Sequence, residues 1–192
     1  MAKTAFKGST LLNPVPAVLV TSKKDDNVNV FTAAWVGTAC TKPPIITVSI
    51  RPERLSYDYI NSSKTLVINL PSRKMVRAVD VCGVRSGRDV DKIKTCNFTL
   101  DKGITVDVPS IRECPVSLEC TVKDIIPLGS HHLFLAEVLQ VNVENFLIHP
   151  DGKIHLEKAD LMCYSHGEYF SINNIPLGKF GYSVKRKIKG RK

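Results

Sequence analysis

The sequence lacks any apolar run that approaches the roughly 18 residues a helix needs to cross a bilayer. Its longest apolar stretches are interrupted by proline, lysine or asparagine. The first residues, Met1-Ala2-Lys3-Thr4, do not lead into the apolar core of a signal peptide. We therefore expect a cytoplasmic protein without a membrane-spanning segment.

Several motifs that bind nucleotides or metals are also missing. The chain has no G-x-G-x-x-G, no G-x-x-x-x-G-K-[ST] and no G-x-S-x-G, so it carries no dinucleotide fingerprint, P-loop or nucleophile elbow. No Cys-x-x-Cys or His-x-x-x-His pair is present to form a closed zinc site, and we predict no metal. The six cysteines stand at uneven intervals, which favours free thiols over a disulfide framework: Cys40, Cys82, Cys96, Cys114, Cys120 and Cys163.

No internal repeat or linker divides the chain, and its 192 residues fit one domain, predicted over residues 1–184. The formal net charge of +9 is concentrated in residues 185–192, which hold six basic residues and no acidic one. Without these six charges the rest of the chain carries +3. We expect a solvated basic tail and no nucleic-acid partner; attraction of the tail to nucleic acid or anionic surfaces is the alternative.

Short β-branched apolar runs separated by turn residues predict a mainly β protein. Residues 17–21 and 28–34 predict a hairpin, because residues 22–27 supply turn chemistry. Pro43-Pro44 predicts the start of a strand at 45–50 that lies deep in a sheet, since it is apolar on both faces apart from two hydroxyls. Further strands are predicted at 65–70, 117–126 and 133–143.

Helical patterns interrupt these strands in the middle of the chain. One helix is predicted at 55–60, and a second begins after Ser72 and ends at Gly83, because apolar residues recur there at spacings of three and four. Residues 86–95 predict a short helix or turn. Strands interrupted in this way predict a Greek-key barrel with helical insertions.

The exit of the strand at 45–50 carries a candidate anion site. Arg51 and Arg54 bring two guanidinium groups to a predicted helix start, where backbone N–H groups have no partner within the helix. Guanidinium groups and free N–H groups at a helix N-terminus both bind phosphate. The sequence therefore predicts a phosphate site that needs no glycine-rich loop.

Three blocks of sequence carry a resemblance to a known family. The first is Asn-x-x-Thr-Ala-x-Trp at 29–35, followed by Pro-Pro and by Val-Ser-Ile-x-Pro-x-Arg at 48–54. The others are Cys-Gly-x-x-Ser-Gly-Arg-x-x-Asp-Lys at 82–92 and Gly-Ser-His-x-Leu-Phe at 129–134. In this order they resemble the flavin reductase and flavoredoxin group of FMN-binding split-barrel proteins. The resemblance implies a split β-barrel, and a homodimer with FMN at or near the subunit interface.

The resemblance also implies which residues hold the flavin. It assigns the phosphate to Arg54, Ser86 and Lys92, with Arg51 and Arg88 as further charges; a solvated surface role is the alternative for each. For the ring it implies a cradle in which backbone N–H groups tune the flavin, formed by Asn29, Val30, Thr32, Ala33, Ala34, Trp35, Ser49 and Ile50. The alternative for Trp35 is that it is an ordinary aromatic side chain of the core.

Cys40 and His131 occupy positions that approach the flavin in similar proteins. The resemblance makes them candidates for contact with a substrate or for redox chemistry. Their alternatives are a small buried thiol and a structural, hydrogen-bonded histidine. The neighbouring His132 points elsewhere if this segment is extended.

The function that the resemblance implies is an FMN-dependent oxidoreductase of the flavin reductase type. NAD(P)H would bind transiently, and electrons would pass through FMN to free flavin, ferric complexes or a partner protein. One alternative is a flavoredoxin-like electron carrier that exchanges electrons with a redox protein and has no NAD(P)H activity. Another is a split-barrel binding module without flavin.

Overall fold

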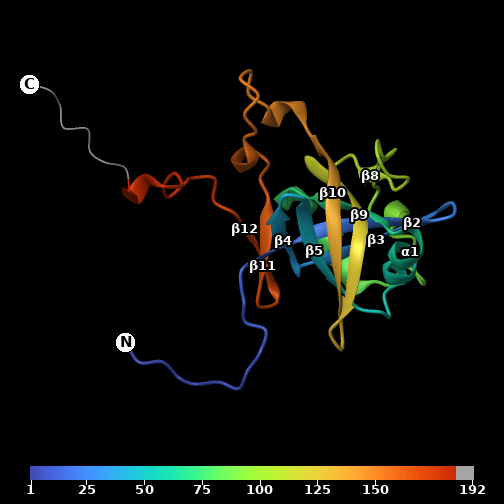
Figure 1. Cartoon of the computed structure of the whole chain (residues 1–192), viewed down its shortest axis with the longest axis horizontal. Helices are drawn as coiled ribbons and strands as arrows, with labels where there is room; N and C mark the ends of the chain where they lie inside the picture. The colour runs from blue at the N-terminus through green and yellow to red at the C-terminus, as the bar shows by residue number, and fades with distance from the viewer. Residues whose placement is uncertain (185–192) are drawn as a thin grey trace, which may run out of the picture.

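The structure, a computed structural model, describes residues 1–184, so the basic tail predicted at 185–192 lies outside the described residues. Its centre is a seven-stranded antiparallel sheet with the strand order β3-β2-β6-β9-β10-β5-β4 (Figure 1). The strands are β2 (Val18–Lys24), β3 (Asn27–Ala33), β4 (Val36–Thr41), β5 (Pro44–Ile50), β6 (Thr65–Leu70), β9 (Val116–Pro127) and β10 (His132–Val143).

The predicted strands are present, and one further strand of this large sheet was missed. The hairpin of β2 and β3 and the long hairpin of β9 and β10 lie where the apolar runs predicted them. No strand was predicted between residues 35 and 43, but residues 36–41 pair with β5 as the edge strand β4. An edge strand has one solvated side, so its polar residues conceal it from a pattern of apolar runs.

The sheet contains the predicted Greek key and curls into a barrel. Strands β6, β9 and β10 are successive antiparallel neighbours, and β5 lies beside β10, so four strands have the Greek-key arrangement. One apolar core joins side chains from both halves of the strand order, including Phe31 of β3, Val48 of β5 and Phe134 of β10. A flat sheet could not bring these side chains together.

Two helices position the loops at one end of the barrel. Helix α1 (Leu55–Ser63) inserts Ile60 into the barrel core and ends at Lys64, whose backbone is left-handed and whose N–H donates to the Ile60 carbonyl at 2.8 Å. Helix α2 (Val76–Val84) follows the 3-10 turn η1 (Arg73–Met75) and packs on β3. The predicted ends of α2 are wrong: Ser72 makes no side-chain capping bond, and Gly83 lies inside the helix, facing Thr32.

A second core lies between α2 and the outer face of the β2–β3 hairpin, and a three-stranded sheet covers it. This sheet was not predicted, because the last third of the chain has no clear periodicity.

Figure 1 shows the segments before β1 (Val15–Pro16) and after β12 (Glu168–Ser171) extending away from the barrel on the same side. In the described part of the chain, no helix has the length and apolarity that crossing a membrane requires. The remaining elements are β1 (Val15–Pro16), α3 (Lys92–Thr95), β7 (Leu100–Asp101), β8 (Ser110–Ile111), η2 (Asn145–Leu147), η3 (Leu156–Lys158), β11 (Met162–Ser165), β12 (Glu168–Ser171) and η4 (Tyr182–Val184).

Candidate functional site

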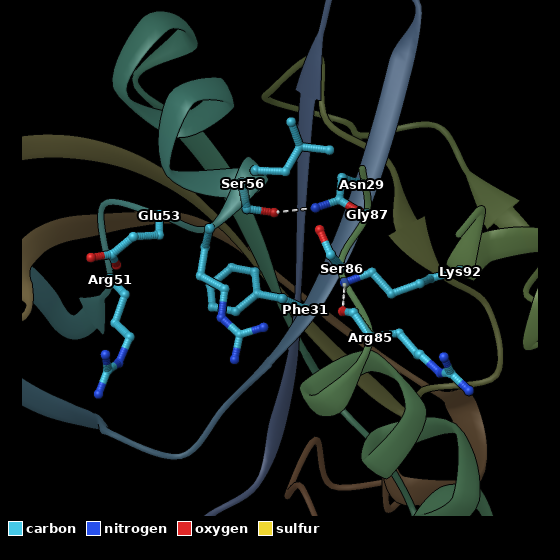
Figure 2. Close-up of a pocket in the computed structure, with 11 residues that line it drawn as sticks. Asn29, Phe31, Arg51, Glu53, Ser56, Arg85, Ser86, Gly87 and Lys92 are labelled. Carbon is cyan, nitrogen blue, oxygen red and sulfur yellow. Dashed lines mark hydrogen bonds between the residues drawn. The ribbon is translucent and has the colours of Figure 1, made fainter. Parts of the chain in front are cut away.

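A pocket of about 220 Å³ lies between the N-terminus of α1, the strand β3 and the loop that follows α2 (Figure 2). Its lining is rich in basic side chains and in small polar residues. Five of the residues predicted for the flavin site meet there: Asn29, Arg51, Arg54, Ser86 and Lys92. The structure thus brings together segments that are more than 60 positions apart in the sequence.

Lys92 is the buried charge of this pocket. Only 3% of the residue is exposed, and its ammonium donates to the carbonyls of Cys82 and Arg85, both at a long 3.3 Å. No ion pair within residues 1–184 provides Lys92 with a carboxylate. An ammonium has three N–H donors, so one of them is left for a further acceptor. Figure 2 shows the side chain reaching toward Ser86 in the middle of the pocket.

Burial lowers the pKa of Lys92, and the nearby Arg54 lowers it further, whereas the Cys82 thiol opposes both effects. A buried cation without a counter-ion is unfavourable unless an anion joins it. The pocket therefore favours a negatively charged ligand at this position.

The N-terminus of α1 forms the opposite wall. Arg54 is the N-cap residue with an extended backbone, and no side chain makes a capping bond there. The N–H groups at the start of a helix have no intrahelical acceptor, and the helix dipole favours negative charge. Leu55 and Ser56, the first two residues of α1, line the pocket beside Arg54. This wall and Lys92 together form a site for an anion between them.

A hydrogen-bonded group of small polar residues holds this wall in place. The Asn29 side chain donates to the Ser56 hydroxyl at 2.9 Å, and the Ser22 hydroxyl lies 2.8 Å from the same oxygen. A Cβ atom at Gly87 would lie 2.2 Å from the Asn29 side-chain oxygen, so glycine is required for this close approach. The loop after α2 is therefore fitted to β3 through Gly87 and Asn29.

Arg88 lies outside the basic pocket and bonds to α1 and to the segment just before it. Its guanidinium donates to the Glu53 carbonyl at 2.6 Å and to the Asp58 carboxylate at 3.1 Å. It lines a neighbouring pocket of about 550 Å³ and does not line the basic one. Through these two bonds the guanidinium joins the loop after α2 to α1, and a role for Arg88 as a further charge at the phosphate stays a prediction.

Most of the side chains predicted to cradle the ring point elsewhere. Val30, Ala33 and Ile50 are buried in the two apolar cores, because alternate residues of a strand face opposite sides of the sheet. The Thr32 hydroxyl donates to the Val79 carbonyl of α2. The side chains of Ala34 and Ser49 do not line the basic pocket either. For these residues, a contact with flavin through the backbone stays a prediction.

Trp35 and His131 form an exposed aromatic pair next to this region. Trp35 is 45% exposed, so the interpretation as a core aromatic is wrong. Its ring centroid lies 4.7 Å from that of His131. Partial burial and the charge of Arg51 lower the pKa of His131, and Glu53 opposes them. The pair thus stands close to the arginine end of the pocket and keeps a neutral imidazole at physiological pH.

Cys40 and His132 lie apart from the basic pocket. Cys40 is exposed on the edge strand β4, where its thiol contacts the Lys42 carbonyl at 3.4 Å, so it is not the small buried thiol of the alternative reading. His132 bonds to the Tyr57 hydroxyl at 2.8 Å, away from Trp35, as the alternation of an extended segment predicts. Within residues 1–184, no three His, Cys, Asp or Glu side chains are placed to hold a metal ion.

Sequence reasoning missed several residues of the pocket. The side chains of Glu53 and Arg85 lie at its edges, and Phe31 forms part of its floor (Figure 2). Leu55, Ser56 and Gly87 were also missed, although the first two directly follow Arg54 and Gly87 lies within a recognised block. A polar Asn29 inside an apolar strand was the available signal, because a buried amide needs a partner such as Ser56.

Comparison with known proteins agrees with this geometry. A family model described as a flavin reductase like domain matches residues 11–172. The flavoredoxin of Desulfovibrio vulgaris (Miyazaki F) is 30% identical and superimposes with a TM-score of 0.89, covering 96% of this chain and 100% of that one. The flavoredoxin of Methanosarcina acetivorans shares the fold at 23% identity, with a TM-score of 0.86 and the same coverage. A protein of Shewanella frigidimarina with a split barrel domain gives a TM-score of 0.80 at 18% identity, covering 88% of this chain and 87% of that one. The chain belongs to the flavin reductase-like family and has its split-barrel fold.

Proposed function

We propose that the basic pocket binds the phosphate of FMN and that the protein is an FMN-dependent oxidoreductase. The observation that carries this proposal is Lys92, a buried ammonium that has no carboxylate partner among residues 1–184 and faces the open N-terminus of α1. A phosphate would receive charge-assisted hydrogen bonds from Lys92 and Arg54, and further bonds from the N–H groups of Leu55 and Ser56. The flavin reductase-like family and the likeness to two flavoredoxins support a flavin as the ligand.

In this proposal the chain binds and orients, while the cofactor supplies hydride and electron transfer when it is bound. Lys92, Arg54 and the start of α1 fix the phosphate end of FMN. Trp35 is 45% exposed and offers a flat indole face against which a second aromatic ring can pack, with the His131 ring tilted beside it. A neutral His131 can donate or accept a hydrogen bond at a bound substrate without adding charge there.

We propose NAD(P)H as the transient electron donor, and free flavin, ferric complexes or a redox protein as the acceptor. No dinucleotide fingerprint is present in the sequence, which suits a donor that binds briefly, reacts and leaves. The test begins with purified full-length protein and added FMN, whose visible absorption reports binding. Stopped-flow mixing with NADH or NADPH should then bleach the flavin band within the time of one turnover. A protein that takes up no FMN would contradict the proposal at its first step.

A flavoredoxin-like electron carrier is the second candidate, favoured by 30% identity to a flavoredoxin over its whole length. The same stopped-flow experiment separates the two functions. Bound FMN that stays oxidised with both nicotinamide nucleotides, yet is reduced rapidly by a ferredoxin or rubredoxin, would assign the protein as a carrier.

We also propose that two copies associate as a homodimer with FMN near their interface. The edge strand β4 is exposed from Gly37 to Thr41, and unpaired strand edges favour association. The segment after β12 carries exposed apolar side chains, among them Ile175, Leu177 and Phe180. Apolar surface of this kind marks a protein interface. Sedimentation equilibrium of the full chain should give twice the monomer mass of 21.3 kDa, and the mass of a monomer would contradict this part of the proposal.

A further inference from the structure

Two cysteine thiols lie side by side at the base of the candidate site. The sulfur atoms of Cys82, near the end of α2, and of Cys96, directly after α3, are 3.9 Å apart, and both thiols are free. A disulfide requires the sulfurs to approach to about 2.05 Å. The two sulfurs therefore have to approach each other by roughly 1.9 Å to form a bond.

The two thiols enclose the loop that forms one wall of the pocket. Residues 83–95 contain Ser86, Gly87 and Lys92. The Lys92 ammonium donates to the Cys82 carbonyl, and the Cys96 N–H donates to the Lys92 carbonyl at 3.0 Å. A bond between the two sulfurs would therefore close a covalent ring around the residues that hold Lys92 in place.

The surroundings of the two thiols make them unequal. Cys96 lines a surface cleft of about 490 Å³ together with Lys74, Arg77 and Glu113, so the charge around the cleft is more positive than negative and attracts an anionic reagent. Cys82 has no exposed surface, so a reagent in solution cannot reach it first. Burial, and then the neighbouring Cys96, raise the pKa of Cys82 to about 12 despite the opposing charge of Lys92. An attack from solvent therefore falls on Cys96, and Cys82 is placed to act second.

We propose that Cys82 and Cys96 are a reversible thiol–disulfide pair, oxidised by a low-molecular-weight disulfide that enters the cleft at Cys96. The Cys96 thiolate attacks one sulfur of the reagent, forms a mixed disulfide and releases the first reagent thiolate. The Cys82 thiolate then attacks the Cys96 sulfur, forms the internal disulfide and releases the second. The two cysteines lose two electrons and two protons, and the reagent disulfide becomes two thiols. This chemistry is independent of flavin binding.

The other four cysteines are placed differently. Cys114 contacts the Met75 sulfur at 3.9 Å, and Cys120 lies in the barrel core. Cys40 is exposed on β4, and Cys163 lies on β11. The alternative is that Cys82 and Cys96 are inert and pack as small apolar side chains. The experiment has to distinguish this alternative from a redox pair.

The test treats reduced full-length protein with glutathione disulfide and follows its intact mass and its peptide map. We expect the mass to fall by that of two hydrogen atoms, and a non-reduced digest to link the peptides containing Cys82 and Cys96. A thiol reductant should restore the starting mass. Four thiols of the six should stay open to alkylation after denaturation.

Three variants give the order of the steps. Cys82→Ala should stop at a mixed disulfide on Cys96, with the mass of one glutathionyl group added. Cys96→Ser, at a partly exposed site, should form neither an internal disulfide nor a mixed disulfide at Cys82. Cys163→Ser, a partly exposed control outside the cleft, should behave as the unchanged protein does. A wild-type protein that keeps six free thiols, or that links another pair, would overturn the proposal even if Cys82→Ala does not fold.

Discussion

Lys92 and Glu119 are both buried and charged, yet the protein treats them in opposite ways. Glu119 on β9 has no exposed surface, and its carboxylate accepts from the N–H groups of Ile104, Thr105 and Val106 at 2.6–3.2 Å. The Thr105 hydroxyl and the Asn142 amide donate to it as well, at 2.8 and 2.9 Å. In the part of the chain that the structure describes, the Lys92 ammonium has only two long bonds, both to carbonyl groups.

The pKa values follow this difference. Burial by itself raises the pKa of Glu119, but the bonds from Ile104, Thr105 and Asn142 outweigh it and lower the pKa to about 2. For Lys92, burial is the largest effect and the pKa is lowered, so its charged form is held less firmly than in water. A buried charge with all its partners stabilises the fold, whereas one that lacks a partner is available to a ligand.

The largest effect is expected from Glu119→Gln. The amide group presents two donors to backbone N–H groups that need acceptors, so several bonds are lost inside the protein. We expect the free energy of unfolding to fall by roughly 3–5 kcal/mol, measured by urea denaturation. Glu168→Gln, on the exposed surface of β12, is the control and should change it by less than about 0.5 kcal/mol. An equal loss in both variants would remove the special role of Glu119.

Acid should weaken the protein through the same carboxylate. A group whose pKa is lowered in the folded state adds stability above its unfolded pKa, and this stability is lost as the pH falls through the folded pKa. Between the usual value of 4.5 and about 2, Glu119 therefore accounts for a loss of about 3 kcal/mol. Unfolding curves measured across this range should show that loss in the wild-type protein and lack it in Glu119→Gln.

Lys92→Met tests the other half of the comparison. Removing the ammonium should weaken FMN binding by a factor of roughly 10 to 100, because one charge-assisted hydrogen bond is lost. The unliganded variant should be as stable as the wild type or more stable, since methionine fills the same space without a buried charge. Fluorescence titration with FMN and urea denaturation measure the two quantities.

Lys94→Met provides a matched control for this variant. Lys94 lies on the same short helix and is exposed, so its loss should leave the affinity for FMN within a factor of about two. A Lys92→Met protein that binds FMN as well as the Lys94→Met protein would show that the buried ammonium does not contact the phosphate.

The smallest effect is a dependence of FMN affinity on pH. Since the pKa of Lys92 is lowered, the free protein loses this proton at a pH below the usual lysine value of 10.5. An anion binds the protonated form better, so the affinity should be full below that pKa and should fall as the pH rises through it. The fall should be absent in Lys92→Met; a decline of equal size in both proteins would assign it to another group.

The sequence predicted local features better than distant contacts. The apolar runs located six of the seven strands of the large sheet, and the blocks around Arg54 and Lys92 located two walls of one pocket. The side chains of Val30, Thr32, Ala33 and Ile50 were harder to place, because their direction depends on which face of each strand meets a core. A motif gives the position of a residue in the chain, and the register of the sheet decides where its side chain points.

The features that sequence reasoning missed all depend on long-range partners. Strand β4 is polar because it lies at an edge, and its pairing with β5 defines it. Glu119 gave no signal in the sequence, since its donors come from a loop whose backbone conformation only the fold determines. The bond from Arg88 to Asp58, thirty positions away, could likewise not be predicted from the sequence.

The contact between Gly87 and Asn29 links two positions that are far apart in the chain. No side chain at residue 87 can coexist with the present orientation of the Asn29 amide, because the first added carbon already overlaps its oxygen. A smaller residue at 29 would remove that obstacle and also the hydrogen bond to Ser56. Across relatives, we expect these two positions to vary together, so that a larger residue at 87 is accompanied by a shorter one at 29.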